Sequence, residues 1–197
     1  GSGTYGTSAT NMTGSARDPR DTIVVQDERY VHLVLVTNLV PTTEYYYEIH
    51  SGTIVYNDNG LPYRITLPAT QSSPPDFYSI FGTVTGSGAA DAIVFGRITS
   101  DSGTSAYASS AVGSGGTWTL SLGGVRTSDY QSYFNFDSSD TLSLTVRTRG
   151  NEVTRSYTLE EVEGDEDISN ALEMIAPAGS TGTLPRGLYD QVMAGVS

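Results

Sequence analysis

The sequence contains neither cysteine nor lysine. Without cysteine the chain cannot form disulfides, thiolate metal sites or a cysteine nucleophile. Its 10 basic residues, all arginine, are outnumbered by 22 acidic residues, which gives a formal net charge of -12. A surface of this charge repels nucleic-acid phosphates and anionic membrane surfaces, so we expect no nucleic-acid partner.

Long apolar runs are also missing. No stretch of 18 apolar residues occurs, which predicts that no segment spans a membrane. No signal-peptide pattern is visible either, so we expect that any export segment is removed or lies upstream.

The abundant residues, Thr, Ser, Gly, Tyr and Val, favour strands and turns over helices. We therefore predict an all-β fold of two tandem, immunoglobulin-like β-sandwich domains with an extended C-terminal tail. In a first domain over residues 1–70, the clearest strands are predicted at 30–36, 44–49, 52–56 and 63–67. The 57–60 turn (NDNG) separates the last two.

Two of these strands have informative faces. Along 63–67, alternation places Tyr63, Ile65 and Leu67 on one side. Along 30–36, both alternating faces are largely apolar, which predicts that both are covered by protein.

Residues 71–76 (QSSPPD) have the composition of a Pro-rich linker. A second sandwich is predicted over 77–159, with seven short strands, one of them at 132–136. Residues 160–197 begin with the acidic run EEVEGDED and continue as a tail broken by Pro and Gly, too short for a domain of its own.

Residues 39–45 (LVPTTEY) resemble the L-x-P-x-T-x-Y signature of fibronectin type III domains. The resemblance implies a tyrosine corner, in which Pro41 sets the turn and the Tyr45 hydroxyl bonds to the upstream backbone. Residues 5–8 (YGTS) are similar to the third strand of bacterial members of that family. The resemblance therefore implies a truncated domain that lacks its first two strands and exposes an open core with unpaired strand edges.

The second segment resembles the carboxypeptidase-regulatory or transthyretin-like sandwiches of secreted bacterial proteins. The similar stretches are 81–84 (FGTV), 91–94 (DAIV) and 116–120 (GTWTL). Together with the Ser/Thr/Gly-rich strands, the two resemblances predict an extracellular or cell-surface location.

The implied gap in the first domain has two interpretations. The chain is a fragment, or another chain supplies the missing strands by strand addition. The tail is the candidate donor, and a head-to-tail contact of this kind builds a filament when it does not close. Its candidate strand-exchange residues are Leu172, Met174, Ile175, Leu184, Leu188 and Val192.

The sequence offers little chemistry. No Gly-x-Ser-x-Gly elbow, phosphate loop or dinucleotide fingerprint is present, so we expect no enzymatic activity and no catalytic residues. The two histidines, His32 and His50, could hold a metal or exchange protons, but no acidic residue has metal-ligand spacing to them, which favours structural roles.

Ligands and modifications are predicted only weakly. Calcium is the best cofactor candidate, through the oxygen-rich loops at 57–60, 137–140 and 165–167, although none completes a calcium-loop pattern. Asn11 begins an N-x-T glycosylation sequon. Tyr46 alternates with Tyr45 and Tyr47 and is expected to face outward, where stacked tyrosines could bind sugars.

Three functions remain open at this point. The first is a non-enzymatic structural subunit of an extracellular filament or surface assembly, a homopolymer joined by strand complementation. The second is a binding module for glycans or a cell surface within a larger secreted protein. The third, an accessory region of a secreted metallophosphatase, would need a catalytic domain that this sequence does not contain.

Overall fold

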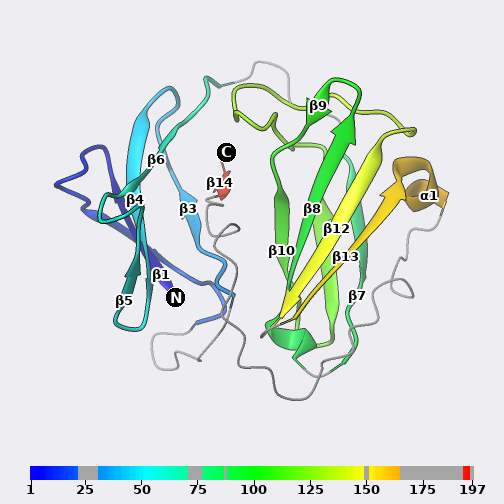
Figure 1. Ribbon diagram of the computed structural model, residues 1–197, viewed down its shortest axis with the longest axis horizontal. Helices are drawn as coiled ribbons and strands as arrows, with labels where there is room; N and C mark the ends of the chain where they lie inside the picture. The colour runs from blue at the N-terminus through cyan, green and yellow to red at the C-terminus, as the bar shows by residue number, and fades with distance from the viewer. Residues whose placement is uncertain (22–30, 71–76, 87, 149–150, 165–192, 196–197) are drawn as a thin grey trace. The chain divides into compact units, whose positions relative to one another are not determined.

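A computed structural model describes residues 1–21, 31–70, 77–86, 88–148, 151–164 and 193–195 (Figure 1). These residues form mainly antiparallel sheets, with one short α-helix and one turn of 3-10 helix, so the all-β prediction is confirmed. The chain divides into two compact units. Unit 1 comprises residues 1–70 and 185–197, and unit 2 comprises residues 71–184, so unit 2 lies between two parts of unit 1 along the sequence.

The larger sheet of unit 1 is antiparallel. Its strands are β1 (Ser2–Gly6), β2 (Gly14–Arg17), β4 (Glu44–Ser51), β5 (Ile54–Tyr56) and β6 (Tyr63–Thr66). The order is β2-β1-β4-β5, and β6 pairs with the first half of β4. A two-residue turn at Asn59 and Gly60 precedes β6, and both residues have positive φ, as the NDNG sequence favours.

The second layer of unit 1 is much smaller. It contains β3 (Leu35–Thr37) and, near the end of the chain, β14 (Met193–Gly195). These two strands pair in parallel, with Met193 opposite Leu35, Ala194 opposite Val36 and Gly195 opposite Thr37. In the part of the chain that the structure describes, β14 is the one strand paired with β3.

Unit 2 contains two packed sheets. The larger one has the order β10-β8-β12-β13, with β9 added beside β8, and the smaller one pairs β7 with β11 (Figure 1). The strands are β7 (Ser79–Thr83), β8 (Ile93–Ser100), β9 (Gly103–Thr104), β10 (Ala108–Ala111), β11 (Thr117–Ser121), β12 (Thr141–Thr148) and β13 (Asn151–Thr158). A 3-10 turn, η1 (Ala89–Asp91), leads into β8.

The unit 2 core is formed by alternate residues of these strands. Leu142, Leu144 and Val146 of β12 are fully buried, and Trp118 and Leu120 of β11 pack in the same cluster. Trp118 pairs across the small sheet with Gly82, where a Cβ would lie 2.7 Å from the indole ring. Glycine at this position leaves room for the only tryptophan of the chain.

The strand predicted at 30–36 is shorter than expected. Residue 30 lies outside the described residues, Val31 to Val34 are not in a strand, and β3 begins only at Leu35. Val36 is buried but Leu35 is 50% exposed, so within a single chain only one of the two faces is covered, and cover of the other by a second subunit stays a prediction. The backbone N–H of Leu33 donates to the Asp18 carboxylate at 2.9 Å instead of to a neighbouring strand.

The strand predicted at 132–136 is also wrong. Tyr133 makes only an isolated bridge with Arg126, and the Arg126 guanidinium lies over the Tyr133 ring, 4.4 Å from its centroid. Phe134 is buried and its N–H donates to the Val125 carbonyl at 2.9 Å. The segment therefore contributes to the core as part of a loop that folds back at residues 127–132, without a continuous ladder.

The sequence predicts a linker from residue 160 onward, but the first residues of this acidic segment are helical. Residues Leu159–Gly164 form helix α1, and Leu159 and Val162 are buried in the unit 2 core. Thr158 and Glu161 form a capping box: the Glu161 N–H donates to the Thr158 hydroxyl and the Thr158 N–H to the Glu161 carboxylate. Neither this helix nor any other in the described segments is long and apolar enough to cross a membrane.

Candidate functional site

The two faces of the larger unit 1 sheet differ in character. Along β4, Tyr45, Tyr47 and Ile49 lie on the inner face, which faces β3. Glu44 and Glu48 lie on the outer face, where they accept hydrogen bonds from the Tyr46 hydroxyl and from the Asn57 side chain. Because successive side chains of a strand point to opposite faces, these residues make the inner face the apolar side of the sheet.

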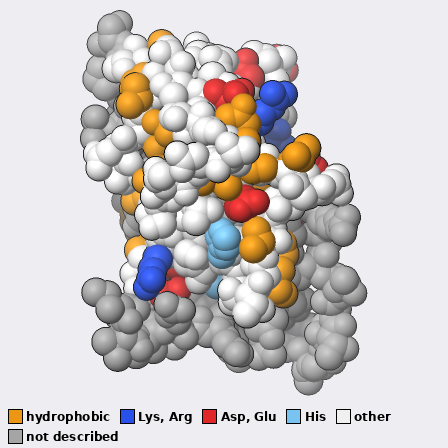
Figure 2. Space-filling view, turned by 90° about the vertical axis from the view of Figure 1, so that its left-hand side faces the viewer, with side chains coloured by type: hydrophobic (Ala, Val, Ile, Leu, Met, Phe, Trp, Pro, Cys, Tyr) orange, Lys and Arg blue, Asp and Glu red, His pale blue; other side chains and the backbone are white. Residues whose placement is uncertain are grey.

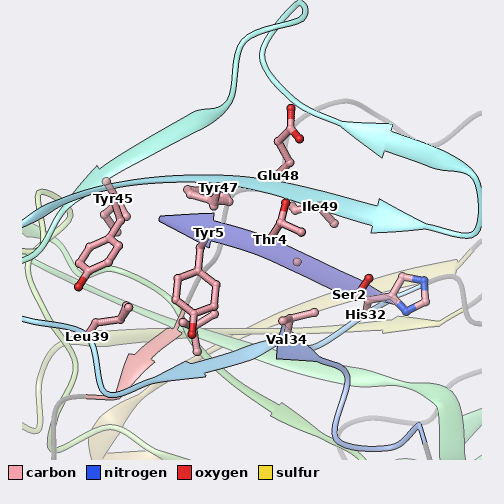
Figure 3. Close-up of a pocket in the computed structure, with 13 residues that line it drawn as sticks. Ser2, Thr4, Tyr5, His32, Val34, Leu39, Tyr45, Tyr47, Glu48 and Ile49 are labelled. Atoms are coloured by element: carbon pink, nitrogen blue, oxygen red, sulfur yellow. The ribbon is translucent and has the colours of Figure 1, made fainter. Parts of the chain in front are cut away.

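A groove lies between this inner face and the chain around β3 (Figure 3). It encloses about 640 Å³, including the part open to solvent. Tyr5 and Tyr45 point from the sheet toward Val34 and Leu39 on the opposite side. The residues that line the groove are Ser2, Gly3, Thr4, Tyr5, His32, Val34, Val36, Leu39, Tyr45, Tyr47, Glu48, Ile49 and Ile65.

The predicted alternation of β6 contributes to this inner face. Ile65 pairs with Tyr45, and Tyr63 pairs with Tyr47 at a ring-centroid distance of 5.3 Å. Leu67, just beyond the strand, is buried, while Arg64 and Thr66 are exposed. The apolar surface thus extends across two neighbouring strands, and the opposite layer is short by comparison.

Tyr45 also fixes one end of the groove. Its hydroxyl accepts a hydrogen bond from the Val40 N–H at 3.0 Å, and its side chain is 8% exposed. Pro41 lies in the turn between these two residues, and its carbonyl accepts hydrogen bonds from the hydroxyls of Thr42 and Thr43. This contact ties the chain that follows β3 to the start of β4.

The other end of the groove is fixed by a partly buried ion pair that the sequence patterns did not predict. The Asp18 carboxylate, 0% exposed, accepts hydrogen bonds from the Arg20 guanidinium at 2.9 and 2.7 Å. It also accepts the N–H of Leu33, while Arg20 donates to the Val31 carbonyl at 2.7 Å. The pair therefore fastens residues 31–33, which precede β3, to the end of β2.

The environment of Asp18 controls its ionisation. Burial alone would raise the pKa of the Asp18 carboxyl, but hydrogen bonds from the Arg20 side chain and from the backbone N–H groups of Leu33 and Arg20, together with the nearby His32 ring, outweigh it. The pKa of this carboxyl is consequently held far below its ordinary value of 3.8. A signal for this site exists in the sequence: Asp18 precedes Pro19, and its carboxylate accepts the Arg20 N–H at 3.1 Å, as in an Asx turn.

The two histidines are not brought together as a metal site. His32 Nε2 lies 3.2 Å from the Ser51 hydroxyl, and its Nδ1 lies 3.8 Å from the Asp18 carboxylate without a hydrogen bond. His50 Nε2 lies 3.1 Å from the Thr4 hydroxyl. Over the described residues, no three His, Asp or Glu side chains are grouped so that they could hold a metal ion.

The oxygen-rich loops serve as turns. Asn57 accepts the N–H of Gly60 at 2.9 Å. Asp137 accepts both the N–H and the hydroxyl of Ser139, which lowers the pKa of its carboxyl, and Asp140 accepts the Asp137 N–H. The 165–167 loop lies outside the described residues.

The other residues singled out in the sequence have simple locations. Asn11 is exposed on the turn between β1 and β2. On the side of unit 1 seen in Figure 2, charged and histidine side chains are interspersed with separate hydrophobic ones. The tail residues Leu172, Met174, Ile175, Leu184, Leu188 and Val192 lie outside the described part of the chain.

Comparison with family models, curated proteins and solved structures found no match to this chain. The resemblances to fibronectin type III domains and to carboxypeptidase-regulatory sandwiches therefore remain predictions from the residues quoted above.

Proposed function

We propose that the protein is a structural subunit of an extracellular filament or cell-surface assembly, and that its copies join by β-strand complementation. The observation that carries this proposal is the imbalance of unit 1. A five-stranded sheet presents an apolar inner face, whereas the layer opposite it contains the three-residue strands β3 and β14 in the described residues.

This imbalance favours addition of a strand. An unpaired strand edge beside apolar surface is a template for pairing with another chain. A strand laid into the groove would gain backbone hydrogen bonds to β3 and would bury alternate apolar side chains against residues such as Ile49 and Ile65, at about 25 cal/mol per Å² of apolar area.

The expected assembly is a filament because donor and acceptor are different surfaces. When a segment of one copy enters the groove of the next, the contact is heterologous and repeats without limit unless the ring closes. The net charge of -12 opposes unspecific association between copies, which favours a specific contact over random aggregation. The extracellular location is supported by the Ser/Thr/Gly-rich strands and by the two resemblances, and cell fractionation would test it.

Removing the end of the chain tests the filament proposal. A protein that ends at Gly164 retains Leu159 and Val162, and with them the whole described core of unit 2. We expect the full chain to form ordered fibres in negative-stain electron microscopy and the shortened chain to give monomers or small aggregates.

Two results would contradict the proposal. Ordered fibres from the shortened chain would exclude the tail as donor. A full chain that sediments as a monomer at every concentration, because its own residues cover the groove and β3, would favour the binding-module alternative. Binding to a glycan array would then test that alternative.

A further inference from the structure

We infer that β14 is the strand exchanged between copies. In an isolated subunit β14 pairs with β3 of its own chain, and in the assembly β3 pairs with β14 of a second copy. This inference rests on the proposed function and adds to it the identity, direction and register of the donor. It also assigns β14 a second state, a self-capping one.

The position of β14 supports this assignment. Its residues pair with Leu35, Val36 and Thr37, the full length of β3. Val36 is 6% exposed and lines the groove, so the capped strand is the one that borders the apolar surface. No other described strand occupies that edge of β3.

The contact is suited to exchange. It consists of three residue pairs in parallel orientation, and parallel pairing is slightly weaker per residue than antiparallel pairing. Leu35, beside Met193 in register, stays 50% exposed, so the self-capped state leaves part of the strand open to solvent. A short, partly exposed contact can open without unfolding the larger sheet.

Chain length permits both states. Residues 165–192 separate α1 from β14, and a segment of that length can span up to about 95 Å when extended. Exchange of an identical strand preserves the β3–β14 pairing in every copy, so the balance between the states depends on protein concentration. Self-capped monomers are therefore expected in dilute solution and linked copies at higher concentration.

Placed thiols can detect the exchange because the chain has no cysteine of its own. Two proteins are made, one with Leu35→Cys and one with Met193→Cys, and they are mixed and oxidised at the concentration where the full chain assembles. We expect a disulfide-linked dimer that contains one copy of each protein, since residues 35 and 193 are direct neighbours across the strand pair.

The controls fix location and register. Leu61→Cys carries a thiol at a residue on a turn of unit 1 that is more exposed than Leu35, 68% against 50%, and mixing it with Met193→Cys should give several-fold less dimer. A second in-register pair, Thr37→Cys with Gly195→Cys, should cross-link as the first does, which guards against a single variant that fails to fold. The out-of-register mixture of Thr37→Cys with Met193→Cys should cross-link less.

The double variant Leu35→Cys/Met193→Cys reports the self-capped state. We expect it to give mainly an internally bridged monomer when oxidised in dilute solution and a ladder of covalent oligomers when oxidised after assembly. An internal bridge at all concentrations, with no mixed dimer above the Leu61→Cys background, would overturn the exchange of β14.

The outcome also separates this inference from the proposed function. Fibres without the 35–193 mixed dimer would leave the filament in place and refute β14 as its donor. Absence of fibres from the unmodified chain would refute the filament, whatever the cross-links show.

Discussion

Leu120 of β11 packs directly onto Gly96 of β8, and this contact joins the two sheets of unit 2 at their centre. A Cβ built on Gly96 would overlap Leu120 Cδ2, and it would also lie 3.4 Å from Leu144 Cδ2 and 3.6 Å from Leu142 Cδ1. The backbone of β8 therefore comes so close to the opposite sheet that a side chain at position 96 would have to displace Leu120.

Gly96→Ala is expected to destabilise unit 2 by about 1–3 kcal/mol, since overpacking displaces neighbours in a dense core. Trp118 is 3% exposed in the same core and is the only tryptophan, so its fluorescence during urea unfolding reports on this unit. Gly124→Ala is the matched control because nothing lies within 4 Å of a Cβ there, and we expect it to change stability by less than about 0.5 kcal/mol. Equal effects of the two variants would contradict the packing described.

Asp18→Asn should destabilise unit 1 by about 3 kcal/mol, because it removes a fully buried carboxylate that accepts hydrogen bonds from the Arg20 guanidinium and from the Leu33 N–H. Hydrogen exchange followed by mass spectrometry should show faster exchange in residues 31–37 and along β4. Asp58→Asn changes an exposed aspartate of the same unit and should leave both segments unaffected. Unchanged exchange in Asp18→Asn would mean that the ion pair does not hold the segment before β3.

The same carboxylate predicts a pH dependence. The pKa of Asp18 is lower in the folded protein than its ordinary value of 3.8, so the unfolded chain binds a proton more readily at acidic pH. The stability that Asp18 contributes is therefore complete above about pH 5 and is lost progressively as the pH falls below the unfolded pKa toward the folded one.

Urea unfolding of the wild type and of Asp18→Asn at several pH values measures this effect. The difference in the free energy of unfolding between the two proteins should be largest at neutral pH and should shrink at pH 3 and below. If this difference in the free energy of unfolding stayed constant with pH, Asp18 would contribute through the packing of its side chain and not through its charge.

Tyr45→Phe removes the acceptor of the Val40 N–H and should lower stability by about 1 kcal/mol. Tyr46→Phe removes a hydroxyl that donates to Glu44 on the exposed face, and we expect no measurable change. Thermal unfolding of the two variants compares them directly, and a larger loss for Tyr46→Phe would show that the tyrosine corner does not secure the chain after β3.

The strands that alternate strictly could be predicted from sequence. In β6 and β11, apolar and polar residues follow the two-residue period. Leu67, Trp118 and Leu120 are buried and Ile65 is half-buried, as that pattern predicts. The turn before β6 was equally clear, because positive φ at two successive residues favours Asn-Gly.

The segment at 31–34 could not be predicted in the same way. It has an ideal strand composition, yet its backbone bonds to the side chains of Asp18 and Arg20, which are remote in sequence. Hydrophobic periodicity contains no information about such a partner. Helix α1, by contrast, was signalled by Thr158 and Glu161 at capping-box spacing and by Leu159 and Val162 three residues apart.

The position of unit 2 within the chain has a consequence for synthesis on the ribosome. The two halves of the β3–β14 pair are translated about 160 residues apart, which at roughly 5–20 residues per second is about 8–30 s. All described contacts of unit 2 lie within residues 77–164, so every residue of its described core is synthesised before β14. Between the synthesis of β3 and that of β14, β3 has no β14 of its own chain to pair with. During this time β14 of a finished copy can pair with it instead.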